Sequence, residues 1–136
     1  MERVTVRRVS AITPASGSPE TESGEWVGAL RDTPSELLLT FTETVEGGKI
    51  FNRVIWRGGV LTVDRRGAAS SRIEFRAGVA QTVELSFPPF TLQMTVFTRE
   101  ILLLPTPAGV GFRVSFSSVI NGERRENELT ITASPL

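Results

Sequence analysis

The side chains best suited to chemistry in this sequence are Glu43, Asn52 and Arg65. Each lies in a segment that alternates apolar and polar residues, and the alternation places all three on the apolar side, where hydrophobic residues are expected. A carboxylate, an amide and a guanidinium on one inward face can orient a ligand at the mouth of a pocket. The alternative is a row at a wet rim, where a Glu–Arg pair contributes little to stability.

Composition removes most other chemistry. The 136 residues include no cysteine, histidine or tyrosine, which excludes disulfides, thiol nucleophiles and thiolate metal sites and removes the common nucleophile–base pairings. Glu43 is the single acid that we can place facing inward, and one carboxylate without a second acid or a histidine is a poor catalytic set. We therefore expect no enzyme, no metal site and no cofactor.

Charge is balanced, with 15 basic and 15 acidic residues. Nucleic-acid-binding domains usually carry a basic excess, so this balance argues against a nucleic-acid partner. Nearly all basic residues are arginines, and if the outward ones cluster they could meet an acidic protein or, less readily, RNA. The nearby acids Glu74 and Glu84 make simple charge balance the plainer interpretation. The arginines predicted to project outward are Arg53, Arg57, Arg72, Arg76 and Arg113.

The sequence carries no targeting or membrane signal that we can identify. Residues 1–10 have no apolar run of signal-peptide length, and no stretch approaches the roughly 20 apolar residues of a membrane-spanning helix. We expect a cytoplasmic protein that does not enter a membrane, and we find no signal for an oligomeric state.

The elements that must position these side chains are strands. Alternation of period two dominates the chain and turn residues recur about every ten positions, which predicts a single all-β domain over 1–136 with about nine or ten antiparallel strands. The polar stretch 13–23 is predicted to be a mobile loop. In the first strand, residues 3–12, the apolar positions change parity after Val6, which predicts a β-bulge near Arg7–Arg8.

Two diglycine turns predict strand register. A two-residue turn at Gly47–Gly48 would place Leu39 opposite Trp56, and one at Gly58–Gly59 would place Trp56 opposite Leu61. The same parity sets Glu43, Asn52 and Arg65 in one row.

Long antiparallel meanders commonly close into barrels, and a barrel of about eight or more strands is either filled by side chains or holds one small ligand. We therefore expect a pocket lined by Trp26, Phe41, Trp56 and Met94 that binds a small apolar or amphipathic molecule. The alternative is a solid barrel that acts as a scaffold through its arginine-rich outer surface.

Two segments carry a family resemblance: SSRIEFRAGVAQTVELSFPPFTLQMTVFTREI, residues 70–101, and GVGFRVSFSSVINGERRENELTITA, residues 109–133. They resemble the YwiB-like family of uncharacterised bacterial β-barrel proteins, most clearly over roughly residues 66 to 132. The resemblance implies a lipocalin-like (calycin) barrel and supplies no catalytic residues. This chain departs from the family in having Phe87-Pro88-Pro89-Phe90 at a corner that is usually Thr-Pro-x-Gly, and Leu85 where a tyrosine is usual; both changes make the corner more apolar.

Overall fold

A computed structural model describes residues 1–106 and 109–136, and over these residues the chain is all strand and turn. Within them, no helix has the length and apolar character needed to cross a membrane. The strands are β1 (Glu2–Pro14), β2 (Glu20–Asp32), β3 (Leu37–Val45), β4 (Gly48–Arg57), β5 (Val60–Gly67), β6 (Ser71–Phe75), β7 (Ala80–Phe87), β8 (Phe90–Thr106), β9 (Gly109–Ile120) and β10 (Glu123–Pro135).

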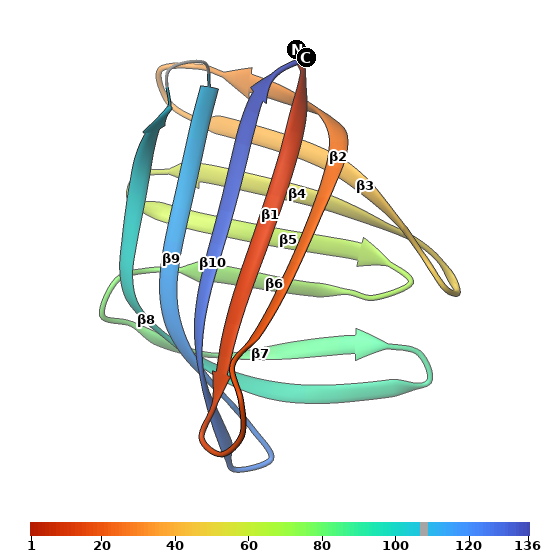
Figure 1. Cartoon of the computed structure of the whole chain (residues 1–136), viewed down its shortest axis with the longest axis vertical. Coiled ribbons are helices and arrows are strands. Elements are labelled where there is room, and N and C mark those ends of the chain that lie inside the picture. The colour runs from red at the N-terminus through yellow and green to blue at the C-terminus, as the bar shows by residue number, and fades with distance from the viewer. Residues whose placement is uncertain (107–108) are drawn as a thin grey trace.

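The ten strands form one antiparallel sheet in the order β6-β5-β4-β3-β2-β1-β10-β9-β8-β7. It consists of two meanders, an N-terminal one (β1 to β6) and a C-terminal one (β7 to β10). The two are joined by a long ladder between β1 and β10, which runs from the pair Val4–Pro135 to the pair Pro14–Arg125 (Figure 1). The sheet curls into a lipocalin-like antiparallel barrel, as the sequence predicted.

The barrel is nearly but not fully closed, because β6 and β7 share no continuous ladder. We call this gap the seam. One isolated bridge crosses it, with N–O distances of 2.7 and 2.9 Å between Ser70 and Ser86. The side-chain amide of Gln81 also lies within 3.0 and 3.2 Å of the backbone nitrogen and oxygen of Glu74, and hydrogen bonds to both when its oxygen faces that nitrogen. The predicted barrel is therefore nearly closed, and the sheet stays open along the seam between β6 and β7.

A hydrogen bond from the connection between β6 and β7 explains why β7 pairs with β8 and not with β6. The backbone nitrogen of Gly78, in the connection 76–79, donates to the carbonyl of Thr98 on β8 at 2.8 Å. The start of β7 is thereby held against β8, with which it forms a complete ladder from Ala80–Phe97 to Phe87–Phe90. The Pro88–Pro89 corner closes that hairpin, as predicted from the inability of proline to donate a ladder hydrogen bond.

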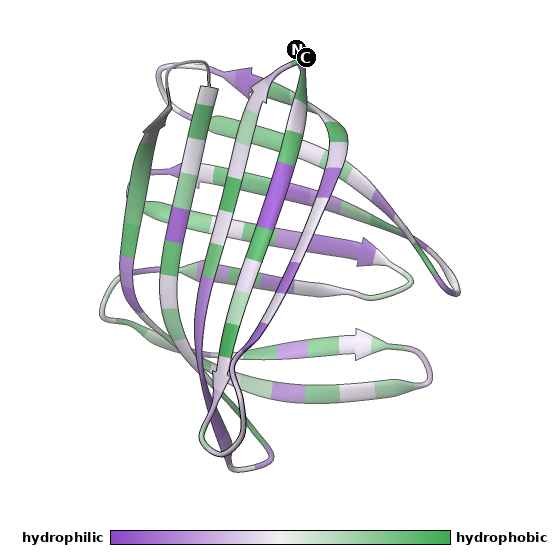
Figure 2. Cartoon of the chain, viewed as in Figure 1, coloured by the Kyte–Doolittle hydropathy of each residue, from purple (hydrophilic) through white to green (hydrophobic). Residues whose placement is uncertain are grey.

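Alternation along the strands divides an apolar interior from a polar exterior, and the banding is plain on β1, β9 and β10 (Figure 2). Inward side chains from both meanders pack into one apolar core. Burying each of these typically contributes about 1.5–3 kcal/mol. The most deeply buried apolar residues are Val4, Val6, Leu39, Val54, Leu61, Phe75, Val96, Val114, Ile131 and Ala133.

The predicted register is right at one diglycine turn and wrong at the other. Trp56 pairs with Leu61 around Gly58–Gly59, whose two positive φ angles suit a tight hairpin. The β3–β4 turn, however, is centred on Glu46 and Gly47, so Leu39 faces Val54 rather than Trp56. Two successive glycines permit either turn, and the two registers differ by two residues, which leaves every side chain on its predicted face.

The first hairpin also differs from expectation. Strand β1 pairs with both neighbours without a register shift, so there is no bulge near Arg7–Arg8, and Arg8 points inward. The predicted loop 13–23 is shorter, because residues 13–14 and 20–23 belong to β1 and β2 and only residues 15–19 connect them. The ladder continues through these polar residues because backbone pairing does not depend on side-chain polarity.

Candidate ligand pocket

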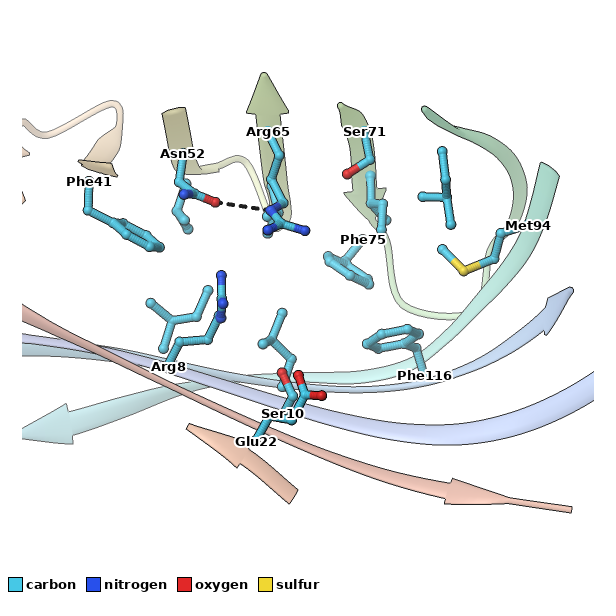
Figure 3. A pocket seen from close by; sticks show the side chains of 16 residues that line it. Arg8, Ser10, Glu22, Phe41, Asn52, Arg65, Ser71, Phe75, Met94 and Phe116 are labelled. Carbon is cyan, nitrogen blue, oxygen red and sulfur yellow. Dashed lines mark hydrogen bonds between the residues drawn. The ribbon is translucent and has the colours of Figure 1, made fainter. Parts of the chain in front are cut away.

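The interior of the barrel contains a pocket of about 330 Å³. It lies toward the end of the barrel with the β1–β2 connection, and all ten strands contribute to its wall. Arg8 and Arg65 point toward each other from opposite walls, and Phe75, Met94 and Phe116 lie together on the right (Figure 3). The lining residues are Arg8, Ser10, Glu22, Phe41, Asn52, Val54, Val63, Arg65, Ser71, Ile73, Phe75, Leu85, Met94, Phe116, Leu129 and Ile131.

A hydrogen-bonded cluster centred on Glu43 lies beside this pocket. One carboxylate oxygen accepts from Nη2 of Arg8 at 2.7 Å. The other accepts from Nδ2 of Asn52 at 2.8 Å and from Nη2 of Arg65 at 3.0 Å. Arg65 Nε also donates to Asn52 Oδ1 at 3.3 Å. The three predicted side chains therefore do come together, with Arg8 as a fourth member; we call these four residues the Glu43 cluster.

The Glu43 cluster keeps its carboxylate charged. Burial of Glu43, whose side chain is 7% exposed, would by itself raise the pKa. Hydrogen bonds from Arg8 and Asn52 and the positive charges of Arg8 and Arg65 outweigh burial and lower the pKa from 4.5 to about 2. At neutral pH the cluster therefore holds two cations and one anion. A carboxylate with so low a pKa is a weak base, and the absence of enzymatic activity stays a prediction.

The orientation of Arg8 depends on its neighbours in β2. Its guanidinium carbon lies 4.8 Å from the centre of the Trp26 ring, a cation–π contact. The ring itself lies over Gly24, where an added Cβ would come within 2.4 Å of the indole. Phe41 of β3 stacks on Trp26, 5.0 Å between ring centres. Arg8 is thus held by an aromatic face and a carboxylate together.

The inner part of the pocket is apolar. Phe75 and Phe116 pack at 4.9 Å between ring centres, and Met94 and Leu85 come from the C-terminal meander. Hydrocarbon placed here would be removed from water, whereas a polar group could reach the Glu43 cluster. The wall thus has separate apolar and charged regions, the usual arrangement of a small-molecule site.

The seven residues predicted for the site divide into three groups. Phe41, Asn52, Arg65 and Met94 line the pocket, as expected. Glu43 and Trp26 do not line it but hold residues that do, through the contacts given above.

Trp56 lies elsewhere, so its predicted place in the pocket wall is wrong. It packs against Phe112 of the apolar core, at 5.8 Å between ring centres, and does not line the pocket. Strand parity correctly turned this side chain inward, but parity does not say at which end of the barrel an inward residue lies.

Sequence reasoning missed four polar residues that line the pocket: Arg8, Ser10, Glu22 and Ser71. Arg8 and Ser10 continue the inward alternation of Val4 and Val6, so unbroken parity was the available signal. Glu22 pairs with Ser10 across β1 and β2 and is exposed at the rim. It is a second acid facing the pocket, which corrects the expectation that Glu43 is the single inward acid.

The outward arginines lie where the alternation predicted. Arg72 and Arg76 form ion pairs with Glu74, at 3.5 and 3.4 Å, and Arg113 pairs with Glu128 at 3.5 Å. Such exposed pairs contribute little to stability. A scaffold role through this surface stays a prediction. Over residues 1–106 and 109–136, no group of three or more metal-ligating side chains gathers that could hold a metal ion.

The ten-stranded, nearly closed antiparallel barrel and its internal pocket together define a small lipocalin-like barrel protein. Residues 9–131 match the family described as a domain of unknown function (DUF1934), and the chain belongs to that family. Its fold is similar to that of the ywiB protein from Bacillus subtilis, with a TM-score of 0.88 and 18% identity over 99% of this chain and 92% of that one. These findings confirm the resemblance seen in the sequence. Comparison with curated proteins gives no match.

Proposed function

We propose that this chain binds a small apolar or amphipathic molecule inside its barrel. The observation that supports the proposal is the pocket itself, to whose wall all ten strands contribute and which combines an apolar region with arginines of the Glu43 cluster. Its volume of about 330 Å³ lies at the lower end of the range for ligand sites, roughly 300–1,000 Å³. Since a water molecule takes about 30 Å³ of liquid, the pocket has room for about ten non-hydrogen atoms.

The first experiment is titration with 1-octanol, a neutral amphiphile of matching size, followed by calorimetry and by tryptophan fluorescence. A Trp56→Phe background leaves Trp26 as the single reporter, next to the pocket wall through Phe41 and Arg8. We expect saturable binding of one molecule per chain. Native mass spectrometry of freshly purified protein would show whether a molecule is already bound.

A pocket-filling variant provides the structural control. Leu85→Trp adds bulk to a residue that lines the pocket, and we expect it to abolish octanol binding. Gln93→Trp adds the same side chain at an exposed position of β8 and should leave binding unchanged. If 1-octanol, octanoate and octylamine all fail to bind the unmodified protein, or bind equally well to Leu85→Trp, the proposal is wrong.

A further inference from the structure

We propose that the pocket selects a singly charged anion with an apolar body, and that Arg8 and Arg65 bind the anionic head group. This rests on the proposed function and adds the chemical class of the ligand. It follows from where the two guanidinium groups point, which of their donors are already used, and how the charges near the pocket add up.

The two arginines retain unused hydrogen-bonding capacity. A guanidinium has five N–H donors. Arg8 gives one nitrogen, Nη2, to Glu43, while Arg65 gives Nη2 to Glu43 and Nε to Asn52. Over residues 1–106 and 109–136, no protein acceptor receives the other donors of Arg8 or those on Nη1 of Arg65. Their side chains are 25% and 31% exposed, and both line the pocket, so the remaining donors are accessible from it.

The charge balance of the Glu43 cluster favours an anion. Two arginines share one carboxylate, which leaves one excess positive charge where the strands exclude much of the water. Because the pKa of Glu43 is lowered, its carboxylate stays ionised well below neutral pH and remains paired with both arginines. Glu22 is the other charged residue of the wall, but it is exposed at the rim, where water screens it. One oxyanion would neutralise the remaining charge.

The cluster is also preorganised, which reduces the entropy lost on binding. Arg8 is fixed between Glu43 and the Trp26 ring, and Arg65 is fixed by Glu43 and Asn52. Guanidinium groups match the two oxygens of a carboxylate, and hydrogen bonds between charged partners are about twice as strong as neutral ones. A head group held here would direct its hydrocarbon toward Met94, Phe75 and Phe116, on the side of the pocket away from Arg8 (Figure 3).

The test compares four probes in calorimetry: octanoate, 1-octanol, octylamine and acetate. Octanoate has ten non-hydrogen atoms, and the next two keep its chain while changing the charge, whereas acetate keeps the head group without the chain. We expect octanoate to bind about tenfold tighter than 1-octanol, because a hydrogen bond to a charged group typically lowers a dissociation constant about tenfold or more. Octylamine and acetate should bind weakest.

Variants locate the head group. Arg65→Met should raise the dissociation constant of octanoate about tenfold and leave that of 1-octanol nearly unchanged, and Arg65→Lys should restore part of the preference. Arg66→Met is the matched control: it is the next residue, 72% exposed, and pairs with Asp64 outside the barrel. It should change neither constant. Glu43→Gln adds to the excess positive charge, and we expect it to tighten octanoate binding several-fold, the opposite of what a merely structural role predicts.

The outcomes separate the two proposals. If 1-octanol and octanoate bind equally well, and Arg65→Met does not alter their ratio, the pocket binds ligands but does not select an anion, and this inference is overturned. If acetate binds as tightly as octanoate, the apolar body adds nothing and the inference is likewise wrong. Absence of binding by every probe would overturn the proposed function itself. Because the comparison among probes uses the unmodified protein, it stands even if a variant does not fold.

Discussion

Lowering the pH should reduce the free energy of unfolding of this protein, partly because one buried carboxylate becomes protonated. The pKa of Glu43 is about 2 in the folded chain and 4.5 for an unperturbed glutamate. One pKa unit corresponds to about 1.36 kcal/mol, so ionised Glu43 adds about 3 kcal/mol to the free energy of unfolding at neutral pH. Because the folded pKa is the lower one, this contribution is fully present above about pH 4.5 and is lost as the pH falls toward 2.

Substituting Glu43 with Gln isolates this effect from the other carboxylates. Urea unfolding of both proteins, followed by tryptophan fluorescence at several values between pH 7 and pH 2, gives the difference in unfolding free energy at each pH. We expect the advantage of the unmodified protein over Glu43→Gln to shrink by about 3 kcal/mol across this range. All other acids titrate in both proteins and cancel in the difference.

A surface acid supplies the control. Glu74 forms ion pairs with Arg72 and Arg76 at the barrel exterior. Exposed pairs of this kind are worth about 0–1 kcal/mol, so Glu74→Gln should show little pH-dependent difference. A difference for Glu43→Gln that stays constant from pH 7 to pH 2 would refute the reasoning, because it would mean that Arg8, Arg65 and Asn52 do not hold Glu43 in its ionised form.

Three further outcomes follow from the fold. Gly28→Ala should lower the unfolding free energy by about 1–3 kcal/mol in urea titrations, because its Cβ would come within 2.4 Å of the Thr40 carbonyl oxygen; a neutral effect would mean that the strands separate easily there. Leu61→Ala, at a fully buried position, should cost about 2–5 kcal/mol, against about 0.5 kcal/mol or less for Leu102→Ala, which is 40% exposed; similar losses would contradict the assigned core. Hydrogen exchange should be faster for backbone amides of β6 and β7 that face the seam than for those in the β1–β10 ladder, and equal protection would argue for a closed barrel.

Much of the site could be predicted because side-chain parity survives errors of register. Glu43, Asn52 and Arg65 were assigned to one face from alternation, and they do meet, although Glu43 pairs across the strands with Ile50. A shift of two residues moves a side chain along the strand without turning it to the other face. Alternation thus predicted which residues face the interior better than it predicted their pairing.

What alternation could not supply is the partner from a distant strand. Arg8 is separated from Glu43 by 35 positions, and an inward arginine contradicts the apolar pattern unless that partner is known. The bulge predicted near Arg7–Arg8, from the change of parity of the apolar residues after Val6, would have turned this charge outward, and the unbroken ladder of β1 shows that it is absent. Likewise, the position of an inward aromatic along the barrel axis depends on strand tilt, so alternation could not show that Trp56 lies outside the pocket wall.

The strand order has a consequence for chain connectivity. Read from β7 through β10 and then β1 to β6, every strand lies beside its successor, so the protein is a circularly permuted version of a simple ten-strand meander. The two chain ends lie side by side (Figure 1), and Val4 pairs with Pro135. If a short linker joined Leu136 to Met1 and the chain were opened within residues 76–79, β10 and β1 would form a hairpin at the place where the two chain ends now meet. That rearranged chain would replace the most sequence-distant ladder by a local one, and it should fold faster to the same barrel.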